Sequence, residues 1–251
     1  MKHIMDLRRF IRIDKSTKYF IIVQILNYGV FMILDIMGKG LQASTLIKFL
    51  LILICFFYVN FRPSVHLLWK LVFFFTLLAD VFLLLINDYY IYGLIFFIIV
   101  QQLYRIYLFS TDKHKEKNII GKLFIGLFVS AIATIIVSYA LYFADIYLDT
   151  LLIISVFYFL TFIQNLFIAI KKNISNPHRT DLFVFTIGLF LFILCDINVA
   201  LFNMFNYIDS SLELLKLISE YSSVLMWTFY GPSQVFISLA ATYSAYDKNK
   251  A

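Results

Sequence analysis

Charged residues are scarce in this chain. Asp, Glu, Lys and Arg make up 14% of its 251 residues, whereas 62% are hydrophobic and 19% are aromatic. In soluble globular domains, charged side chains usually account for about a quarter of the residues. Together with a mean hydropathy of +0.88, this shortage excludes a soluble globule and predicts an integral membrane protein.

Proline, glycine and cysteine are also few, with 3, 8 and 2 residues respectively. No segment rich in Pro, Gly or Ser divides the chain, so we expect one compact domain. Cys55 and Cys195 both fall inside apolar runs, which excludes a disulfide framework and a paired-cysteine zinc site. The four histidines lack the spacing of metal ligands. We therefore expect no metal and no cofactor.

Long apolar runs are abundant. A helix needs about 20 residues to cross about 30 Å of hydrocarbon. Eight runs meet this length, at about residues 19–37, 43–61, 66–87, 90–110, 119–141, 146–170, 182–204 and 221–242. The chain is thus predicted to be an all-α, polytopic membrane bundle of about eight transmembrane helices. Residues 1–18 would form a basic tail, 19–242 a single transmembrane domain and 243–251 a C-terminal tail.

The connection before the last run, "NYIDSSLELLKLISEY", has its own pattern. Its leucines and isoleucine are spaced as in a short helix that lies in the membrane interface. We therefore expect a separate interfacial helix there.

Basic residues fall mostly on one side of the predicted spans. Of the 21 Lys and Arg residues, three lie on the outer side when the N-terminus is placed inside: Lys39, Lys48 and Lys216. The acidic residues of the outer side are Asp88, Asp145, Asp149, Asp209, Glu213 and Glu220. This bias predicts that both termini are cytoplasmic. It also explains the net charge of +6 by topology and anionic lipid, with no nucleic-acid partner. The cell (plasma) membrane is the expected location, and the sequence leaves the oligomeric state open.

Two carboxyl groups lie within apolar runs. Asp80 is in "FTLLADVFLLLIN" and Asp196 is in "LFILCDINVALFN", and each is followed seven positions later by an asparagine, Asn87 or Asn203. A charge at the bilayer centre costs about 2.5 to 3.5 kcal/mol on insertion scales, so both carboxyls should face the bundle interior. Residues seven apart lie on nearly the same helical face, so each helix would carry a polar stripe.

Two further runs carry polar side chains. In "VQQLYRIYLF", Gln101 and Gln102 precede Arg105 by four and three residues, so the three side chains should project toward a common side. In "WTFYGPSQVFISLA", the Gly-Pro pair should kink the helix and free a backbone carbonyl near Gln234. We expect a polar cavity in the outer half of the bilayer, closed by one or more of Tyr104, Tyr107, Tyr158 and Tyr230.

The positions of these groups hint at an internal repeat. Four spans separate Asp80 from Asp196, and each aspartate span is followed by a span with a mid-membrane glutamine. A parallel duplication of a four-helix unit, a 4+4 repeat, would produce this pattern. Coincidence is the alternative, because few positions match.

A purely structural role is the alternative to function for the polar groups. Asn, Gln and Tyr side chains commonly form hydrogen bonds between membrane helices, and Asp80 could pair with Lys48 or Arg105. Asp35, near an outer helix end, is adequately explained by pairing with a neighbouring lysine. Placing two carboxyls at the same depth of the membrane only to link helices would cost insertion free energy. This cost favours a function for Asp80 and Asp196.

Several stretches resemble one family. "LLADVFLLLINDYYIYGLIFFIIVQQLYRIYLF" resembles the central motif of the YhhN-like lysoplasmalogenases, and "GLFLFILCDINVALFN" and "YGPSQVFISLA" are similar to the family's second aspartate helix and last helix. "LIKFLLIL" resembles its lysine-bearing second helix. The chain departs from the pattern in having Ala79 for the usual Gly, Phe49 where Pro often follows the lysine, and Gln101 where His is common. Since Gln cannot relay a proton as His can, the last departure bears on activity more than on fold.

The resemblance implies cleavage of the vinyl-ether bond of a lysoplasmalogen, which gives a fatty aldehyde and a glycerophospho-base. Such cleavage begins with protonation of carbon and passes through an oxocarbenium-like cation, to which water adds. It therefore requires a carboxylic acid and a carboxylate, as glycosidases do. Asp80 and Asp196 would form this catalytic pair.

The expected substrate is a lysophospholipid with an ether-linked chain that enters between helices. Arg105 or Lys48 would bind its phosphate. The expected binding residues are Lys48, Gln101, Gln102, Tyr104, Arg105, Asn203, Tyr230 and Gln234.

Two other functions compete with the hydrolase. A small transporter could use the aspartate pair as a proton relay and the broken last span as a gate. A non-catalytic protein that binds or senses lipid is the third reading, and Gln101 favours it.

Overall fold

The apolar runs form helices. The computed structural model describes residues 14–38, 40–86, 89–110, 118–204, 207 and 213–248, and every element among them is helical. The elements are α2 (Lys15–Ile36), α3 (Leu41–Asn60), α4 (Leu67–Asp80), the π-helix η1 (Val81–Leu85), α5 (Tyr90–Ser110), α6 (Ile119–Phe143), α7 (Thr150–Ser175), α8 (Thr180–Asn203) and α9 (Glu213–Lys248). With α4 and η1 counted as one span, eight helices in the described part are long and apolar enough to cross a membrane. The predicted polytopic bundle is confirmed.

The last span differs from its prediction. α9 runs from Glu213 to Lys248 without a break, so the expected interfacial helix is, from Glu213 onward, the first turns of α9. No Gly or Pro interrupts "ELLKLISEY", and an established helix adds good helix formers readily. Residues 205–206 and 208–212 of that connection lie outside the described residues. The first span likewise begins at Lys15 and not near residue 19.

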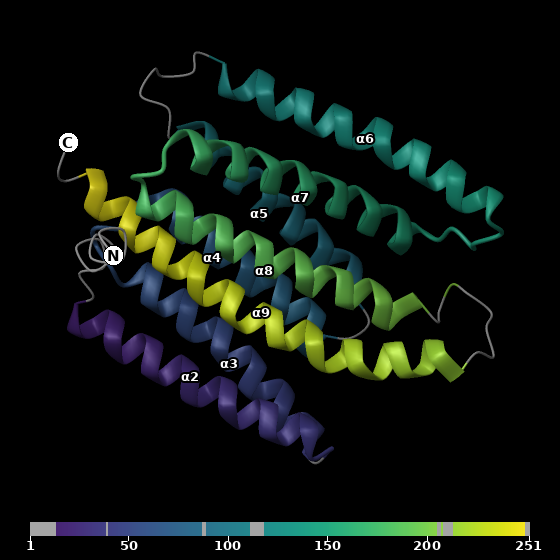
Figure 1. The fold of residues 1–251 in the computed structure, drawn as a ribbon, viewed down its shortest axis with the longest axis horizontal. Coiled ribbons are helices and arrows are strands. Elements are labelled where there is room, and N and C mark those ends of the chain that lie inside the picture. Colours follow the sequence, from purple (N-terminus) through teal and green to yellow (C-terminus); the bar gives the residue numbers. More distant parts are fainter. Residues whose placement is uncertain are drawn as a thin grey trace, which may run out of the picture.

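The Gly-Pro pair does not end α9. Pro232 lies inside the helix and cannot donate to the carbonyl of Thr228, four residues earlier. The hydroxyl of Tyr28, from α2, donates to that carbonyl over 3.4 Å. In Figure 1 the earlier, lime-green part of α9 lies at an angle to its yellow part. The expected freed carbonyl is thus that of Thr228, one turn before the proline and not near Gln234, and a tyrosine of a neighbouring helix donates to it.

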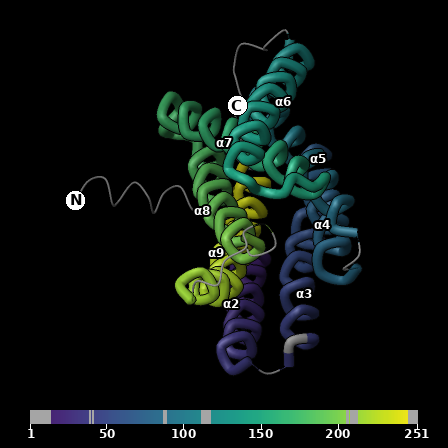
Figure 2. The backbone as a smooth tube through the Cα atoms, turned by 90° about the vertical axis from the view of Figure 1, so that its right-hand side faces the viewer, coloured from purple at the N-terminus to yellow at the C-terminus, as the bar shows by residue number. Residues whose placement is uncertain are grey.

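The helices pack in a pattern that repeats after four spans. α3 packs against α9 and α7 against α5, while α2 contacts α3 and α9 and α6 contacts α7 and α5. The first span of each half, α2 or α6, lies at an edge of the bundle, and the two edges are opposite (Figures 1 and 2). These neighbour relations agree with the predicted parallel 4+4 repeat.

Polar side chains of the spans are found mainly inside the bundle, whereas apolar ones are found both in its core and on its outer faces. α6, for example, exposes Phe124, Phe128 and Ile136, and its two buried residues are Ser130 and Thr134. Lipid tails solvate apolar side chains as well as a protein core does, so burial is most valuable for polar groups. Buried polar residues of the interior include Thr76, Asp80, Gln101, Arg105, Asn165 and Gln234.

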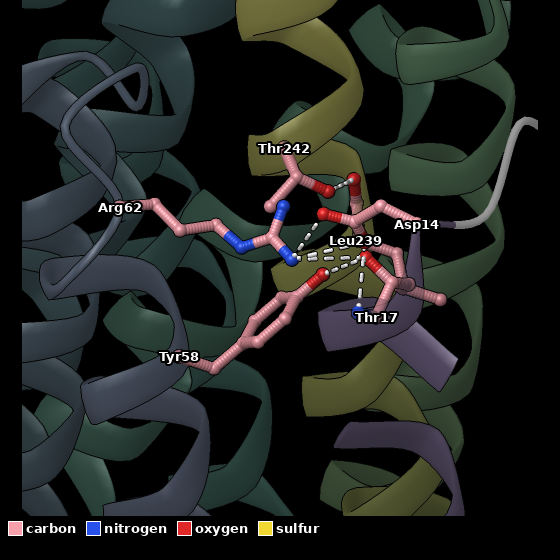
Figure 3. Close-up of polar contacts among 6 residues, drawn as sticks. All are labelled: Asp14, Thr17, Tyr58, Arg62, Leu239 and Thr242. Carbon is pink, nitrogen blue, oxygen red and sulfur yellow. Dashed lines mark hydrogen bonds and ion pairs between the residues drawn. The ribbon is translucent and has the colours of Figure 1, made fainter. Parts of the chain in front are cut away.

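The start of α2 and the end of α9 lie at the same end of the bundle (Figure 1). Arg62, just after α3, donates to both carboxylate oxygens of Asp14, over 3.1 and 3.2 Å, and to the hydroxyl of Thr17 over 3.0 Å. The Thr17 hydroxyl is also hydrogen-bonded to that of Tyr58, 2.8 Å away. Figure 3 shows this cluster beside Thr242 of α9. It ties the first span to the second at this end.

The cluster should make stability depend on pH. Partial burial acts to raise the pKa of Asp14, but hydrogen bonds from Thr17 and Arg62 outweigh it and lower the pKa below its ordinary value. A lowered folded-state pKa gives stability that is present above the unfolded pKa and is lost as the pH falls through the folded one. Asp14→Asn, which keeps the helix cap, should lower Tm slightly at pH 7 and by less at about pH 3. Thermal unfolding in detergent measures this, and an equal loss at both pH values would contradict it.

The orientation of the bundle in the membrane follows from the basic residues and can be tested by labelling. Tyr147 is 74% exposed between α6 and α7, and His178 is exposed between α7 and α8, at the opposite end. A membrane-impermeant maleimide should label Tyr147→Cys in intact cells and should label His178→Cys only after permeabilisation. The two native cysteines are buried and serve as the background control. Labelling of residue 178 in intact cells would reverse the topology.

Candidate active site

Asp80 lies where its helix changes type. It is the last residue of α4, and η1 follows directly, with the amide of Ile86 donating to the carbonyl of Val81 over 3.1 Å. This five-residue step is the hydrogen bond of a π-helix, a form that occurs often at functional sites. The wider turn changes the angle between successive side chains. The α-helical spacing that predicted Asp80 and Asn87 on one face therefore does not apply after Asp80. Asn87 itself lies outside the described residues.

Gly93 allows α5 to approach this turn. A Cβ atom at Gly93 would lie 2.6 Å from the Cγ of Leu83 and 3.1 Å from the carbonyl oxygen of Ala79. A residue with a side chain would therefore push α5 away from the segment that carries Asp80.

The Asp80 carboxyl is bound by a tyrosine. Asp80 is 3% exposed, and the hydroxyl of Tyr230, from α9, donates to its Oδ2 over 2.6 Å. Among the described residues, no cation forms an ion pair with it. The alternative that Asp80 pairs with Lys48 or Arg105 is wrong: Lys48 is 2.7 Å from the carboxylate of Asp35, and Arg105 is bound by amides, as described below.

Asp196 has an equivalent partner. The hydroxyl of Tyr158, from α7, donates to its Oδ2 over 2.8 Å, and the residue is half-buried on α8. No ion pair to Asp196 occurs in the described part of the chain. Asn203, predicted to share its face, lies at the end of α8, and its amide donates to the carbonyl of Val199 over 2.8 Å. That side chain is used within its own helix.

Aromatic rings connect the two tyrosine–carboxyl pairs. Phe192 lies 5.3 Å from Tyr230 and 5.5 Å from Phe97, centroid to centroid, and Phe97 lies 5.9 Å from Tyr158. Cys195 is close enough to Asp80 and Asp196 to interact electrostatically with both. The carboxyls therefore belong to one region of the bundle, although each binds its own tyrosine and no hydrogen bond joins them.

Buried polar atoms without partners gather near Asp80. Thr76 lies one turn before Asp80 on α4, and Gln234 lies one turn after Tyr230 on the antiparallel α9, so the two are level with each other. Thr76 Oγ1, Gln234 Oε1 and Tyr104 Oη are all buried and make no hydrogen bond. Because buried polar groups are normally paired, this group indicates an interior that can bind water or the polar part of a ligand.

Lys48 lies on the same side of the bundle. Its ammonium is 4.8 Å from the ring centroid of Trp227, and that ring is 5.5 Å from Tyr230. One aromatic ring therefore separates Lys48 from the tyrosine that binds Asp80. Tyr107, by contrast, donates to Asp181 near the start of α8, over 2.8 Å, and does not close a cavity at the carboxyls.

Arg105 belongs to a second polar group. Its Nε donates to Asn165 Oδ1 and its Nη2 to Gln164 Oε1, each over 2.9 Å. The amide of Asn165 also donates to Gln101 Oε1 over 2.9 Å, so Gln101 and Arg105 share a side as predicted. The amide atoms of Gln102 are buried and have no partner. The sequence analysis missed Gln164 and Asn165, although two adjacent amides within the apolar run "FLTFIQNLFIAI" were a usable signal.

Fold and site together define a polytopic helical membrane protein with two tyrosine-bound carboxyls inside the bundle. A sequence model of the YhhN family matches residues 42–241, and the chain belongs to the YhhN family. The match includes both carboxyls and their tyrosines. Comparisons with curated proteins and with solved structures gave no significant match.

The tyrosine hydrogen bonds should stabilise the fold. Tyr230→Phe removes a buried donor and leaves the Asp80 carboxyl without it, so we expect a loss of about 1 to 3 kcal/mol. Tyr158→Phe should also be destabilising, because the part of Asp196 that the protein does not cover lies within a span, where hydrocarbon offers no replacement donor. Tyr221→Phe, at a residue that is 64% exposed, is the control. Thermal unfolding in detergent measures all three, and equal Tm values would show that these bonds contribute nothing.

Proposed function

We propose that the protein hydrolyses the vinyl-ether bond of lysoplasmalogen-type lipids, with Asp80 and Asp196 as the acid and base. The observation that carries the proposal is the pair of intramembrane carboxyls, each bound by a neutral tyrosine and neither ion-paired within the described residues, in a chain of the YhhN family. Carboxyls without a cationic partner retain the ability to give and take protons. The products would be a fatty aldehyde and a glycerophospho-base.

The reaction divides between the two carboxyls. One, as the neutral acid, protonates the vinyl carbon farther from the ether oxygen, which produces an oxocarbenium-like cation. The other, as the carboxylate, takes a proton from the water that adds to this cation. The resulting hemiacetal breaks its carbon–oxygen bond to glycerol, giving the aldehyde and the free hydroxyl. One water is consumed, and the two carboxyls return to their starting protonation states after one proton passes between them.

The neighbouring groups suit the polar part of such a substrate. Lys48 lies beside the Trp227 ring, and that ring lies beside Tyr230, so Lys48 is our candidate for the phosphate. The unpaired atoms of Thr76, Tyr104 and Gln234 would hold the attacking water or the glycerol hydroxyl. A location in the plasma membrane is part of the proposal.

Two substitutions test the acid and base roles. Asp80→Asn and Asp196→Asn should each abolish aldehyde release from a lysoplasmalogen, because Asn keeps the shape and much of the hydrogen bonding but cannot exchange a proton. Glu220→Gln, the same change at an exposed carboxyl of α9, should leave turnover intact. Aldehyde is measured with purified, folded protein.

Matched lipids test the bond that is cleaved. The saturated-ether and the ester lysolipid of the same chain length should release no aldehyde, because neither has a carbon–carbon double bond to protonate. If either Asn variant kept near-parental turnover, or if the parent cleaved no vinyl-ether lipid, the hydrolase proposal would be abandoned.

A further inference from the structure

Asp196 is less covered by the protein than Asp80. Asp80 is 3% exposed, whereas Asp196 is only half-buried on α8. The hydroxyl of Tyr158 binds one oxygen of the Asp196 carboxyl, Oδ2, and within the described residues the other oxygen has no hydrogen-bond donor. An uncovered carboxyl inside a span is costly, so the stability of the fold does not explain the opening beside Asp196.

The parts of α7 and α8 on the outer side of Asp196 are loosely packed. The two helices lie side by side (Figure 1). None of residues 150–157 of α7 is buried, whereas five residues from Tyr158 to Ala169 are. The buried residues of α8 end at Asn198, two positions after Asp196. Close packing of both helices therefore ends at the level of the Tyr158–Asp196 hydrogen bond.

A second tyrosine joins the two helices at their outer ends. The hydroxyl of Tyr207, which follows α8, lies 3.4 Å from both carboxylate oxygens of Asp149, the N-cap of α7. Asp149 and Tyr158 are nine positions apart on α7, or about 13 Å. Between these two contacts lie residues 150–157 of α7 and 199–203 of α8, and we call this region the window.

The inner half of the bundle is closed. Trp69, Tyr107 and Phe185 are all buried there, and their ring centroids are 4.5 to 5.5 Å apart. The hydroxyl of Tyr107 donates to the buried carboxylate of Asp181, which Arg179 also binds. These aromatic and ionic contacts block a route from the inner surface to the carboxyls.

Both carboxyls lie closer to the outer surface of the bundle than to the inner one, with the sides set by the basic residues. Asp196 is seven residues, or about 10 Å, from the outer end of α8 at Asn203. It is sixteen residues, or about 24 Å, from the inner end at Thr180. Asp80 is thirteen residues from the inner end and five from the outer end of its span, Leu67–Leu85.

This depth suits a lipid of the outer leaflet. In a lysolipid only the three-carbon glycerol unit separates the ether bond from the phosphate, so the bond lies close to the membrane surface that holds the headgroup. A lipid from the inner leaflet would have to carry its charged phosphate deep into the hydrocarbon. Lys48, our candidate for the phosphate, is paired with Asp35, one residue before the outer end of α2 at Ile36.

We propose that the protein takes its lipid from the outer leaflet, through the window between α7 and α8. The ether bond reaches Asp196 there, the glycerol unit lies between the two helices, and the hydrocarbon chain extends into the surrounding membrane. The choice of leaflet rests on the proposed function, because the position of the cleaved bond within the lipid sets the required depth. The window rests on the packing of α7 and α8 alone.

Matched Trp substitutions test the window with a lipid that is not cleaved. Ala200 is exposed on α8, four residues after Asp196 and on the same face, so Ala200→Trp covers the window without disturbing the core. It should raise the Kd for a saturated-ether lysolipid about tenfold or more. Ala140→Trp, at an exposed position of α6, should leave the Kd unchanged. Titration of the purified protein, followed by native mass spectrometry, measures both.

A second blocking position lies on the other side of the window. Ser155 is half-buried on α7, three residues before Tyr158 and on the same face, and Ser155→Trp should weaken binding as Ala200→Trp does. Ser155→Ala, which only removes a hydroxyl, should bind as the parent does. Unchanged Kd values in both Trp variants, or a parent that does not bind the saturated-ether lysolipid, would overturn the window.

The sidedness of hydrolysis tests the leaflet. Right-side-out and inside-out membrane vesicles are prepared, the orientation of the protein is fixed by labelling Tyr147→Cys, and lysoplasmalogen is added to the outside of each. Its charged headgroup crosses a bilayer slowly, so right-side-out vesicles should release aldehyde about tenfold faster. Detergent should remove the difference.

The outcomes separate the leaflet from the hydrolase itself. Equal or faster release from inside-out vesicles, with full release in detergent, would overturn the outer leaflet as the source and leave the hydrolase intact. A protein that releases no aldehyde in either orientation or in detergent would refute the hydrolase and, with it, the choice of leaflet. The Trp variants decide on the window in both cases, because binding of the saturated-ether lysolipid requires no cleavage.

Discussion

Hydrocarbon offers no partner to a polar group, and the rest of the structure follows from that constraint. Polar side chains within a span therefore face the interior of the protein, where other polar groups are within reach. Asp80, Gln101, Arg105 and Asn165 are all buried, whereas the outer faces of the helices carry large apolar side chains. The groups that could take part in chemistry are therefore inside the bundle, among buried residues most of which are apolar.

The buried cations and the two intramembrane carboxyls have different kinds of partner. Lys48 is ion-paired with Asp35, and Arg105 is bound by the amides of α7. The carboxyls of Asp80 and Asp196 are instead bound by tyrosine hydroxyls. A tyrosine donates one hydrogen bond without adding charge, so it positions a carboxyl while leaving its proton exchange available. This division of partners suits a site in which carboxyls react and cations bind.

The packing pattern recurs in the two halves of the bundle, but the partners of the two carboxyls do not. The neighbour relations of the first four spans recur in the last four, yet Asp80 takes its tyrosine from α9, in the other half, and Asp196 takes its own from α7, in the same half. The two aspartates also differ in burial. The acid and base roles that we propose would require two carboxyls in different environments, and the two carboxyls have different tyrosine partners.

The sequence by itself determined the number of spans, the helical class, the pairing of Asp35 with a neighbouring lysine and the shared side of Gln101 and Arg105. These features follow from span length, from short sequence separations and from the cost of polar groups in lipid. Only the tertiary structure decided which of the 17 tyrosines bind the carboxyls, because the two bonds join residues 38 and 150 positions apart. The tertiary structure also decided the π-helical turn after Asp80. Nothing in "VFLLL" distinguishes this segment from an α-helix, and Gly93 packs against the turn only once α5 has folded back. The amide partners of Arg105 come from α7, two spans away, and periodicity along one helix carries no information about which other helix will lie against it.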